Sequence, residues 1–286
     1  MVPRNKTLFC AYVFLALALP IGLPPLLPAQ LSPDQSSVLE STRASALKFA
    51  EHLPDFICTQ VTHRRIIGQG QLVTGASGSG GGVPQGGSRV DADDVIEERL
   101  TYIGGNEKYE VLKVNGRRAN GIDHMKLQGM ITTGEFGTAL HEIFDPDSHT
   151  TFSWDRKEYI DGQEVYVYAF HVPQEHGWEV VTQDPGGKLA APYSGRIYVD
   201  PQAFTVLRVT SALEFPRGFS ILHSERMIEY KQVTIANKEY LLPSHSEVRA
   251  EDRLQSYVNE VDFKDYHKFG AESTVHYEGE APGKPD

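Results

Sequence analysis

Histidines are the first side chains in this sequence that could support chemistry. Five of them occupy the middle of the chain, at His124, His141, His149, His171 and His176. Zinc sites typically use histidines four residues apart on a helix, or close pairs supported by carboxylates and thiolates. His141 has no second histidine four residues later, and His171 and His176 flank a proline in an expected loop. We interpret the five as surface or hydrogen-bonded core histidines, and we predict no metal and no cofactor.

Nucleophilic and acid–base chemistry find little support. The sequence has no Gly-x-Ser-x-Gly motif, which would present a serine nucleophile on a sharp turn. Asp93-Asp94 and Glu97-Glu98 are two carboxylate pairs of the kind that glycosidases use. Neighbours on a strand point to opposite faces, however, so a solvated strand edge is the preferred interpretation of this run. We therefore predict that the protein is not an enzyme, with an unrecognised hydrolase as the most distant alternative.

Cysteine usage points to a fold without disulfides. The chain has two cysteines, and Cys10 falls in a segment that we expect to be removed. The mature chain would then contain only Cys58, which excludes an intramolecular disulfide. Cys58 lies in a strand-like stretch with no basic neighbour to lower its pKa, so we predict a small buried hydrophobic residue and not a nucleophile.

Residues 1–29 have the pattern of a secretory signal peptide. Arg4 and Lys6 precede an apolar run over 8–23, and a small residue, Ala29, ends the segment. The alternative is a membrane anchor, but the run is shorter than the roughly 20 residues of a spanning helix and contains Pro20. We predict export to the periplasm or the extracellular space, cleavage near Ala29, and no stable membrane span afterwards.

Composition limits the partners and the domain number. The chain of 286 residues carries 27 basic and 38 acidic residues, a net charge of −11, and no basic stripe that would meet phosphates, so we predict no nucleic-acid partner. A hydrophobic content of 40% supports a real core. We predict a single domain over 30–278, with a Gly/Ser-rich flexible loop at about 68–90 and a disordered tail at 279–286.

The second half of the chain predicts an antiparallel sheet. Residues 194–277 form five or six consecutive segments with period-two alternation. In the first pair, Ile197 and Val199 share one face, and Leu207 and Val209 are expected to share one face of the next strand. Upstream, Asn115-Gly116 and Asp161-Gly162 predict tight hairpins. Pro243 suits an edge strand or a bulge.

Two helices are expected to cover this sheet. Ser32, Pro33 and Gln35 form a helix start with a capping box, and Pro54 ends that helix. A shorter amphipathic helix is predicted by the spacing of its apolar residues, before a stop at Asp145-Pro146. These apolar residues are Phe136, Leu140, Ile143 and Phe144.

Short motifs resemble a known superfamily. The segment 194–200, followed by 206–209, resembles the exported outer-membrane lipoprotein-sorting (periplasmic lipoprotein carrier) superfamily. Further short segments are similar to uncharacterised secreted bacterial members with the same architecture, at 53–58, 134–137, 240–243 and 263–266. The resemblance implies an unclosed half-barrel whose helices lid a hydrophobic cavity for acyl chains, and it implies no catalysis. The chain departs from the carriers in its greater length and in the Gly/Ser insertion at 75–88.

These observations combine into one expected fold and two main functions. We expect an α+β fold in which a curved antiparallel sheet, an unclosed half-barrel, carries helices on its concave face. The first function is a non-catalytic binder or carrier of lipid acyl chains or a lipidated protein. Its ligand would contact Phe136, Leu140, Ile143 and Phe144, although the same residues also suit a packed core. The second is a structural or protein-interaction module of the cell envelope with a filled core. The sequence does not predict an oligomeric state.

Overall fold

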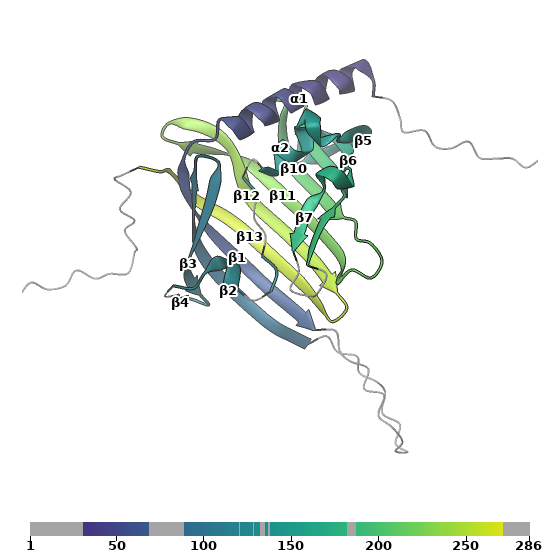
Figure 1. Ribbon diagram of the computed structural model, residues 1–286. Helices are drawn as coiled ribbons and strands as arrows, with labels where there is room; N and C mark the ends of the chain where they lie inside the picture. Colours follow the sequence, from purple (N-terminus) through teal and green to yellow (C-terminus); the bar gives the residue numbers. More distant parts are fainter. Residues whose placement is uncertain are drawn as a thin grey trace, which may run out of the picture.

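The computed structural model describes residues 31–68, 89–119, 121–127, 129–131, 135–136, 138–181 and 187–270. Most of these residues belong to one large curved sheet with two helices against it (Figure 1). Four predicted features lie outside the described residues, namely the signal peptide at 1–29, the Gly/Ser segment at 75–88, the last strand at 273–277 and the tail at 279–286.

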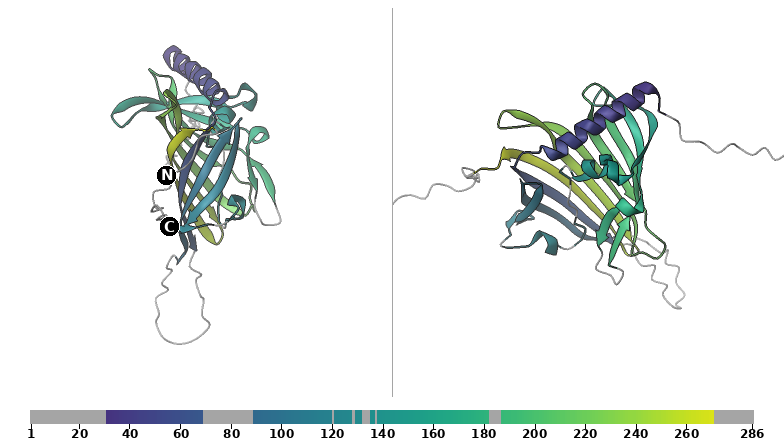
Figure 2. Two further views of the ribbon diagram at one scale, coloured as in Figure 1. Left: turned by 90° about the vertical axis from the view of Figure 1, so that its left-hand side faces the viewer. Right: turned by 45° about the horizontal axis from the view of Figure 1, so that its top comes forward.

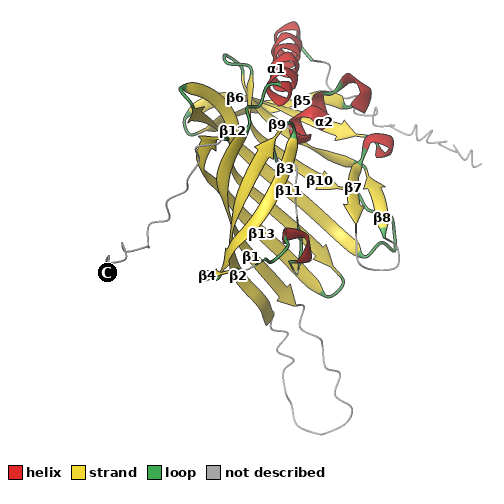
Figure 3. Cartoon of the chain, turned by 60° about the vertical axis from the view of Figure 1, so that its left-hand side comes forward, coloured by secondary structure: helices red, strands yellow, loops and turns green. Residues whose placement is uncertain are grey.

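The main sheet has eleven strands in the order β4-β3-β2-β1-β13-β12-β11-β10-β9-β6-β5, and neighbouring strands run antiparallel (Figure 3). In the part of the chain that the structure describes, the edge strands β4 and β5 do not pair with each other, so the half-barrel is unclosed. The predicted α+β class is confirmed. The strands are β1 (Phe56–Gly68), β2 (Arg89–Ile103), β3 (Asn106–Val114), β4 (Arg117–Arg118), β5 (Thr151–Ile160), β6 (Gln163–Val172), β9 (Tyr193–Asp200), β10 (Thr205–Leu213), β11 (Ile221–Ile235), β12 (Lys238–Asp252) and β13 (Gln255–Lys268), with a separate hairpin of β7 (Trp178–Val181) and β8 (Lys188–Ala191).

The two helices are α1 (Pro33–Glu51) and α2 (Thr138–Phe144), and three short 3-10 turns are η1 (His124–Lys126), η2 (Pro146–Ser148) and η3 (Gln174–His176). The predicted capping box is present, because Ser32 accepts from the amide of Gln35 and the Gln35 side chain accepts from the amide of Ser32. α1 crosses the sheet near one end of its strands, with α2 close by (Figure 2). Neither helix of the described chain combines the length and the apolar character that crossing a membrane requires.

Both helices pack on one side of the sheet, which we call the concave face. Their buried residues form a cluster with side chains of β6, β9, β10 and β11. A second cluster continues along the same side over β1, β2, β12 and β13, and Phe49 of α1 packs against both. The opposite, outer face has a small apolar cluster of its own around Val165, Val167 and Tyr198.

Tight turns and bulges shape the strands. Asn115-Gly116 and Asp161-Gly162 have positive φ at both residues, as the predicted two-residue hairpins require. The prediction that Leu207 and Val209 share a face is wrong. The register shifts between Val206 and Arg208, so Val206 and Val209 are both buried with the helices while Leu207 packs on the outer face. A bulge adds one residue to the strand and breaks the period-two pattern.

Pro243 lies where β11 and β12 change register, between the pairs Glu229–His245 and Tyr230–Pro243. The predicted bulge is confirmed, although β12 is an interior strand and not an edge.

Gly195 on β9 meets a different constraint. A Cβ atom there would lie 1.9 Å from the carbonyl oxygen of Thr210 and 2.9 Å from the Phe170 ring, so only glycine fits.

Candidate functional site

The four predicted lining residues separate into two regions of the concave face. Leu140, Ile143 and Phe144 lie on α2, each 1% exposed, and pack with α1 and with strands β6 to β11. Phe144 stacks on Phe152 with a ring separation of 5.5 Å. Phe136 is equally buried but precedes α2 and belongs to the second cluster. Three of the four residues are therefore part of a helix-covered core, and Phe136 has separate surroundings.

The aromatic rings around Phe136 all come from strands, and Phe49 of α1 and Leu53 pack against the same cluster. Its ring centroid lies 5.3 Å from that of Phe56 on β1, 6.5 Å from Tyr102 on β2, and 5.0 and 6.3 Å from Phe263 and Tyr266 on β13. We call these five residues the aromatic end. The strand side chains make a concave apolar site, and one side chain from a short turn occupies it.

Cys58 borders the aromatic end. Its side chain is 1% exposed and packs in the same cluster as Phe56 and Phe136. Burial, followed by the nearby carboxylate of Glu107, raises the pKa of the thiol well above its ordinary value. The prediction of a buried hydrophobic cysteine is confirmed, and a thiol in this state is a poor nucleophile.

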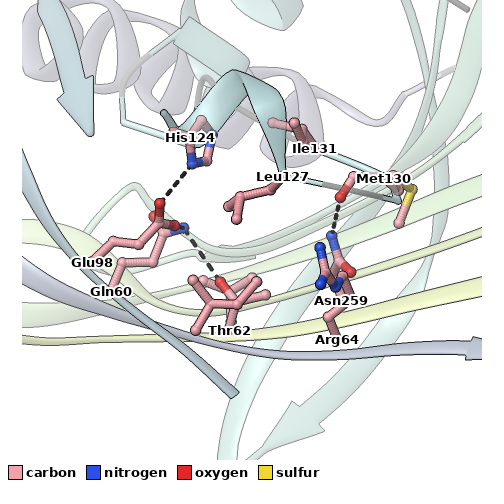
Figure 4. A pocket seen from close by; sticks show the side chains of 11 residues that line it. Gln60, Thr62, Arg64, Glu98, His124, Leu127, Met130, Ile131 and Asn259 are labelled. Atoms are coloured by element: carbon pink, nitrogen blue, oxygen red, sulfur yellow. Dashed lines mark hydrogen bonds and ion pairs between the residues drawn. The ribbon is translucent and has the colours of Figure 1, made fainter. Parts of the chain in front are cut away.

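A polar region follows directly along the same strands. Gln60 lies two residues after Cys58 on β1, and Glu98 two residues before Leu100 on β2, so both face the concave side. Glu98 is 1% exposed. Its carboxylate accepts from Gln60 Nε2 at 3.2 Å and pairs with His124 Nδ1 at 2.7 Å (Figure 4). We call Gln60, Thr62, Arg64, Glu98, His124 and Asn259 the polar end.

The segment that covers the polar end is held from several sides. His124 stacks on Tyr109 with ring centroids 4.3 Å apart, and Asp123 accepts from the amide of Met125. Asn259 Nδ2 donates to the carbonyl oxygen of Met130 at 2.9 Å. Residues 121–136, as far as they are described, therefore cover the polar end through His124 and Met130 and the aromatic end through Phe136. We call them the cover segment.

The basic group of the polar end also has a partner. Arg64 donates to Asp94 Oδ2 at 2.5 Å, and its side chain is 9% exposed. The hydrogen bond from Arg64, followed by one from Asn115, lowers the pKa of Asp94 below its ordinary value. Asp94 thus remains a carboxylate that balances the guanidinium, as Glu98 is paired with His124.

A cavity of about 20 Å³ lies between these groups, enough for about one water molecule. Two of its polar lining atoms, His124 Nε2 and Asn259 Oδ1, are buried and have no hydrogen-bond partner among the described residues. Val261 lines this cavity and also packs in the aromatic cluster. The aromatic and polar ends are therefore two parts of one continuous surface, and Figure 4 shows the polar end from close by.

The outer face carries a wide open groove of about 430 Å³ across β9 to β12. Its lining includes Arg196, Thr210, Glu225 and Arg249. Arg196 donates to Asp155 Oδ2 at 2.6 Å, and Arg249 pairs with Glu247 and Glu225. Arg196 and Arg249 are therefore engaged in ion pairs at the protein surface, and the third arginine of the lining, Arg226, lies over the Trp178 ring.

The predicted solvated edge over Asp93-Asp94 and Glu97-Glu98 is wrong. β2 lies between β1 and β3, and Glu98 is among the most buried side chains. Glu98 shares one face of β2 with Ile96 and Leu100, which are both buried, and this spacing is the signal that could have identified it. Among the described residues, no three His, Cys, Asp or Glu side chains are arranged to hold a metal ion.

Comparison with known proteins adds only distant structural neighbours. Neither a protein-family model nor a curated protein sequence matches the chain. The fold is similar to that of a LolA superfamily protein from Nitrosomonas europaea, with 15% identity, a TM-score of 0.38, and coverage of 82% of this chain and 93% of that one.

Two other solved structures are similar at the same level. An outer membrane lipoprotein-sorting protein domain from Vibrio parahaemolyticus has 10% identity and a TM-score of 0.31, covering 82% of this chain and 93% of that one. A DUF1329 family protein from Desulfovibrio piger has 8% identity and a TM-score of 0.33, covering 82% and 95%.

Proposed function

We propose that this chain is an exported, non-catalytic protein that binds lipid acyl chains on its concave face, and that Phe136 occupies the acyl site when no ligand is bound. The observation that carries the proposal is the place of Phe136. A single side chain from a turn fills an aromatic site whose walls, Phe56, Tyr102, Phe263 and Tyr266, all come from the sheet. Because these four side chains belong to strands, they would stay in place if the turn that carries Phe136 moved.

Energetics support an exchange of Phe136 for a chain. Each methylene that leaves water contributes roughly 0.8 kcal/mol, so an acyl chain of ordinary length can offset the exposure of one phenylalanine side chain, worth about 1.5–3 kcal/mol. Of the four predicted lining residues, Leu140, Ile143 and Phe144 would form the stable cover of the neighbouring half, and Phe136 the exchangeable group.

Truncation of Phe136 tests the proposal. Phe136→Ala should enlarge the aromatic site and increase the fluorescence of a bound apolar dye several-fold over wild type, and the protein purified from its host should carry more extractable acyl lipid by mass spectrometry. The matched control is Tyr198→Ala, which removes a buried aromatic ring from the outer face. Equal dye binding by the two variants, or no lipid with either, would contradict the proposal.

The second candidate is a protein-interaction module of the cell envelope with a filled core. It is favoured by the tight packing of Leu140, Ile143 and Phe144, each 1% exposed. The same experiment separates the two functions, because a filled core gives neither dye binding nor extractable lipid after Phe136→Ala.

Export of the protein is part of the proposal and is supported by the pattern of residues 1–29. Expression of the full chain in a bacterial host, followed by N-terminal sequencing of the protein in the periplasmic fraction, should show a chain that starts near Gln30. An uncleaved chain in the membrane fraction would instead indicate an anchor.

A further inference from the structure

We infer that the concave face binds the carboxylate head of a fatty acid through one unpaired arginine, Arg226, and three buried hydroxyl groups beside it. The hydroxyl groups belong to Tyr193, Tyr230 and Ser246, and we call the four residues the head site. The inference rests on the proposed function, because it places the head of the ligand whose chain displaces Phe136.

Arg226 is a charged side chain without a paired counter-charge. It shares the concave face of β11 with Ile228 and Tyr230, because alternate residues of a strand point to the same side. Its guanidinium lies 4.2 Å from the centroid of the Trp178 ring and makes no ion pair or hydrogen bond with the described residues. Burial raises the pKa of Glu142 on α2 and the charge of Arg226 opposes that rise, but the two side chains form no ion pair. Stacking on Trp178 uses the face of the guanidinium, so its in-plane N–H groups stay available to a carboxylate.

The three hydroxyl groups are buried donors that the described part of the chain does not use. Tyr193, Tyr230 and Ser246 are each at most 3% exposed, and none of their side-chain oxygens has a hydrogen-bond partner among the described residues. Ser246 pairs across the sheet with Ile228, the residue between Arg226 and Tyr230 on the same face of β11. The Tyr193 ring lies 6.4 Å from the Trp178 ring that covers Arg226.

The protonation of the head site is fixed at neutral pH. An arginine side chain keeps its charge in proteins, and a serine hydroxyl keeps its proton. Burial raises the pKa of Tyr193 and Tyr230 above its ordinary value, and the nearby charge of Arg226 opposes that rise in both. One positive charge beside three neutral hydroxyl groups matches a head with one negative charge and several acceptor lone pairs, which a carboxylate has.

The head site borders the aromatic end. Tyr266 of the aromatic end donates its hydroxyl to the carbonyl oxygen of Pro243 at 2.6 Å, and Pro243 is the β12 partner of Tyr230. From Tyr230 to Arg226 the distance along β11 is about 14 Å, four strand residues. A fatty acid whose carboxylate binds Arg226 can therefore pass Tyr230 and place the far part of its chain in the site that Phe136 fills.

Two ligands with the same chain test the inference. Oleate and methyl oleate are titrated against the dye-loaded wild-type protein at about pH 8, where a carboxylate is ionised, and below the concentration at which oleate forms micelles. We expect oleate to bind about tenfold or more tightly than its ester, the effect of a charge-assisted hydrogen bond. Arg226→Gln should abolish this preference and leave the affinity for methyl oleate unchanged. The matched control is Arg196→Gln on the outer face, which should keep the preference.

Removal of one hydroxyl group separates binding from folding. Tyr230→Phe deletes an oxygen that has no partner among the described residues, so the urea midpoint of the ligand-free protein should stay the same or rise. The same variant should bind oleate several-fold more weakly than wild type and methyl oleate equally well. A lower urea midpoint with unchanged oleate affinity would show that the hydroxyl serves the fold, and would overturn its place in the head site.

The outcomes separate the two proposals. Equal affinities of the wild type for oleate and methyl oleate, or a preference for oleate that Arg226→Gln retains, would overturn the head site and leave acyl binding intact. Failure of both ligands to bind wild type and Phe136→Ala would overturn both proposals. Because the comparison of the two ligands uses the wild-type protein, it tests the head site even if Arg226→Gln does not fold.

Discussion

The concave face has two halves that are covered in different ways. Over β6 to β11 the cover is helical, with Leu140, Ile143 and Phe144 packed into a hydrophobic cluster with α1. Over β1, β2 and β13 the cover is an irregular segment that places one ring, Phe136, in an aromatic site and one ring, His124, over a polar cavity. Helical packing stabilises a closed core, whereas a cover of single inserted side chains can be exchanged for a ligand piece by piece. Under the proposed function, this difference would let one curved sheet contain both a permanent core and a binding surface.

Truncating one phenylalanine in each half should have the largest effect. Phe136→Ala and Phe144→Ala remove side chains of equal burial, and each should lower the free energy of unfolding by about 3–5 kcal/mol in urea titrations. Only Phe136→Ala should gain binding of an apolar dye. A similar gain in Phe144→Ala would mean that the two halves do not differ.

Removing the buried carboxylate of the polar end should be nearly as costly. Glu98→Ala leaves His124 and Gln60 buried without their acceptor, so we expect a loss of about 3 kcal/mol. The control is Glu260→Ala, which breaks a pair between the exposed side chains of Glu260 on β13 and Arg65 on β1 and should cost at most about 1 kcal/mol. Equal losses would show that the polar end is open to water.

Adding a single carbon atom to the helix-covered half should lower the stability of the protein. Gly195→Ala places a Cβ atom 1.9 Å from the Thr210 carbonyl, which should cost about 1–3 kcal/mol in thermal or urea unfolding. At Gly270 no atom lies within 4 Å of the added carbon, so Gly270→Ala should change the stability by less than about 0.5 kcal/mol. A tolerated Gly195→Ala would indicate looser packing than the structure shows.

The smallest expected effect is a pH dependence at the aromatic end. Burial raises the pKa of Cys58, so above its ordinary value of 9.0 the unfolded chain loses the thiol proton while the folded chain retains it. The stability that Cys58 contributes is complete below pH 9 and decreases as the pH rises further. The urea midpoint should therefore fall less steeply between pH 8 and 10.5 in Cys58→Ala than in wild type. Identical slopes would contradict the raised pKa.

Much of the fold follows from local sequence. The capping box at Ser32, the turns at Asn115-Gly116 and Asp161-Gly162, and the bulge at Pro243 each depend on a few neighbouring residues, and the structure contains all of them. The predicted face of Leu207 is wrong because a bulge adds one residue to the strand, and nothing in the composition of the strand indicates that bulge. The pairing of His124 with Glu98 joins residues 26 positions apart through the cover segment, and no spacing rule along the chain predicts it. The binding role of Phe136 stays a prediction.

Photo-crosslinking tests the central claim most directly. An oleate analogue with a diazirine in its acyl chain is bound to the wild-type protein, irradiated, and mapped by peptide mass spectrometry. The account predicts labels on β1, β2 and β13 near Phe56, Tyr102 and Phe263, with labelling reduced by excess unlabelled oleate. Labels confined to α1, α2 and β6, or labels that unlabelled ligand does not reduce, would contradict it.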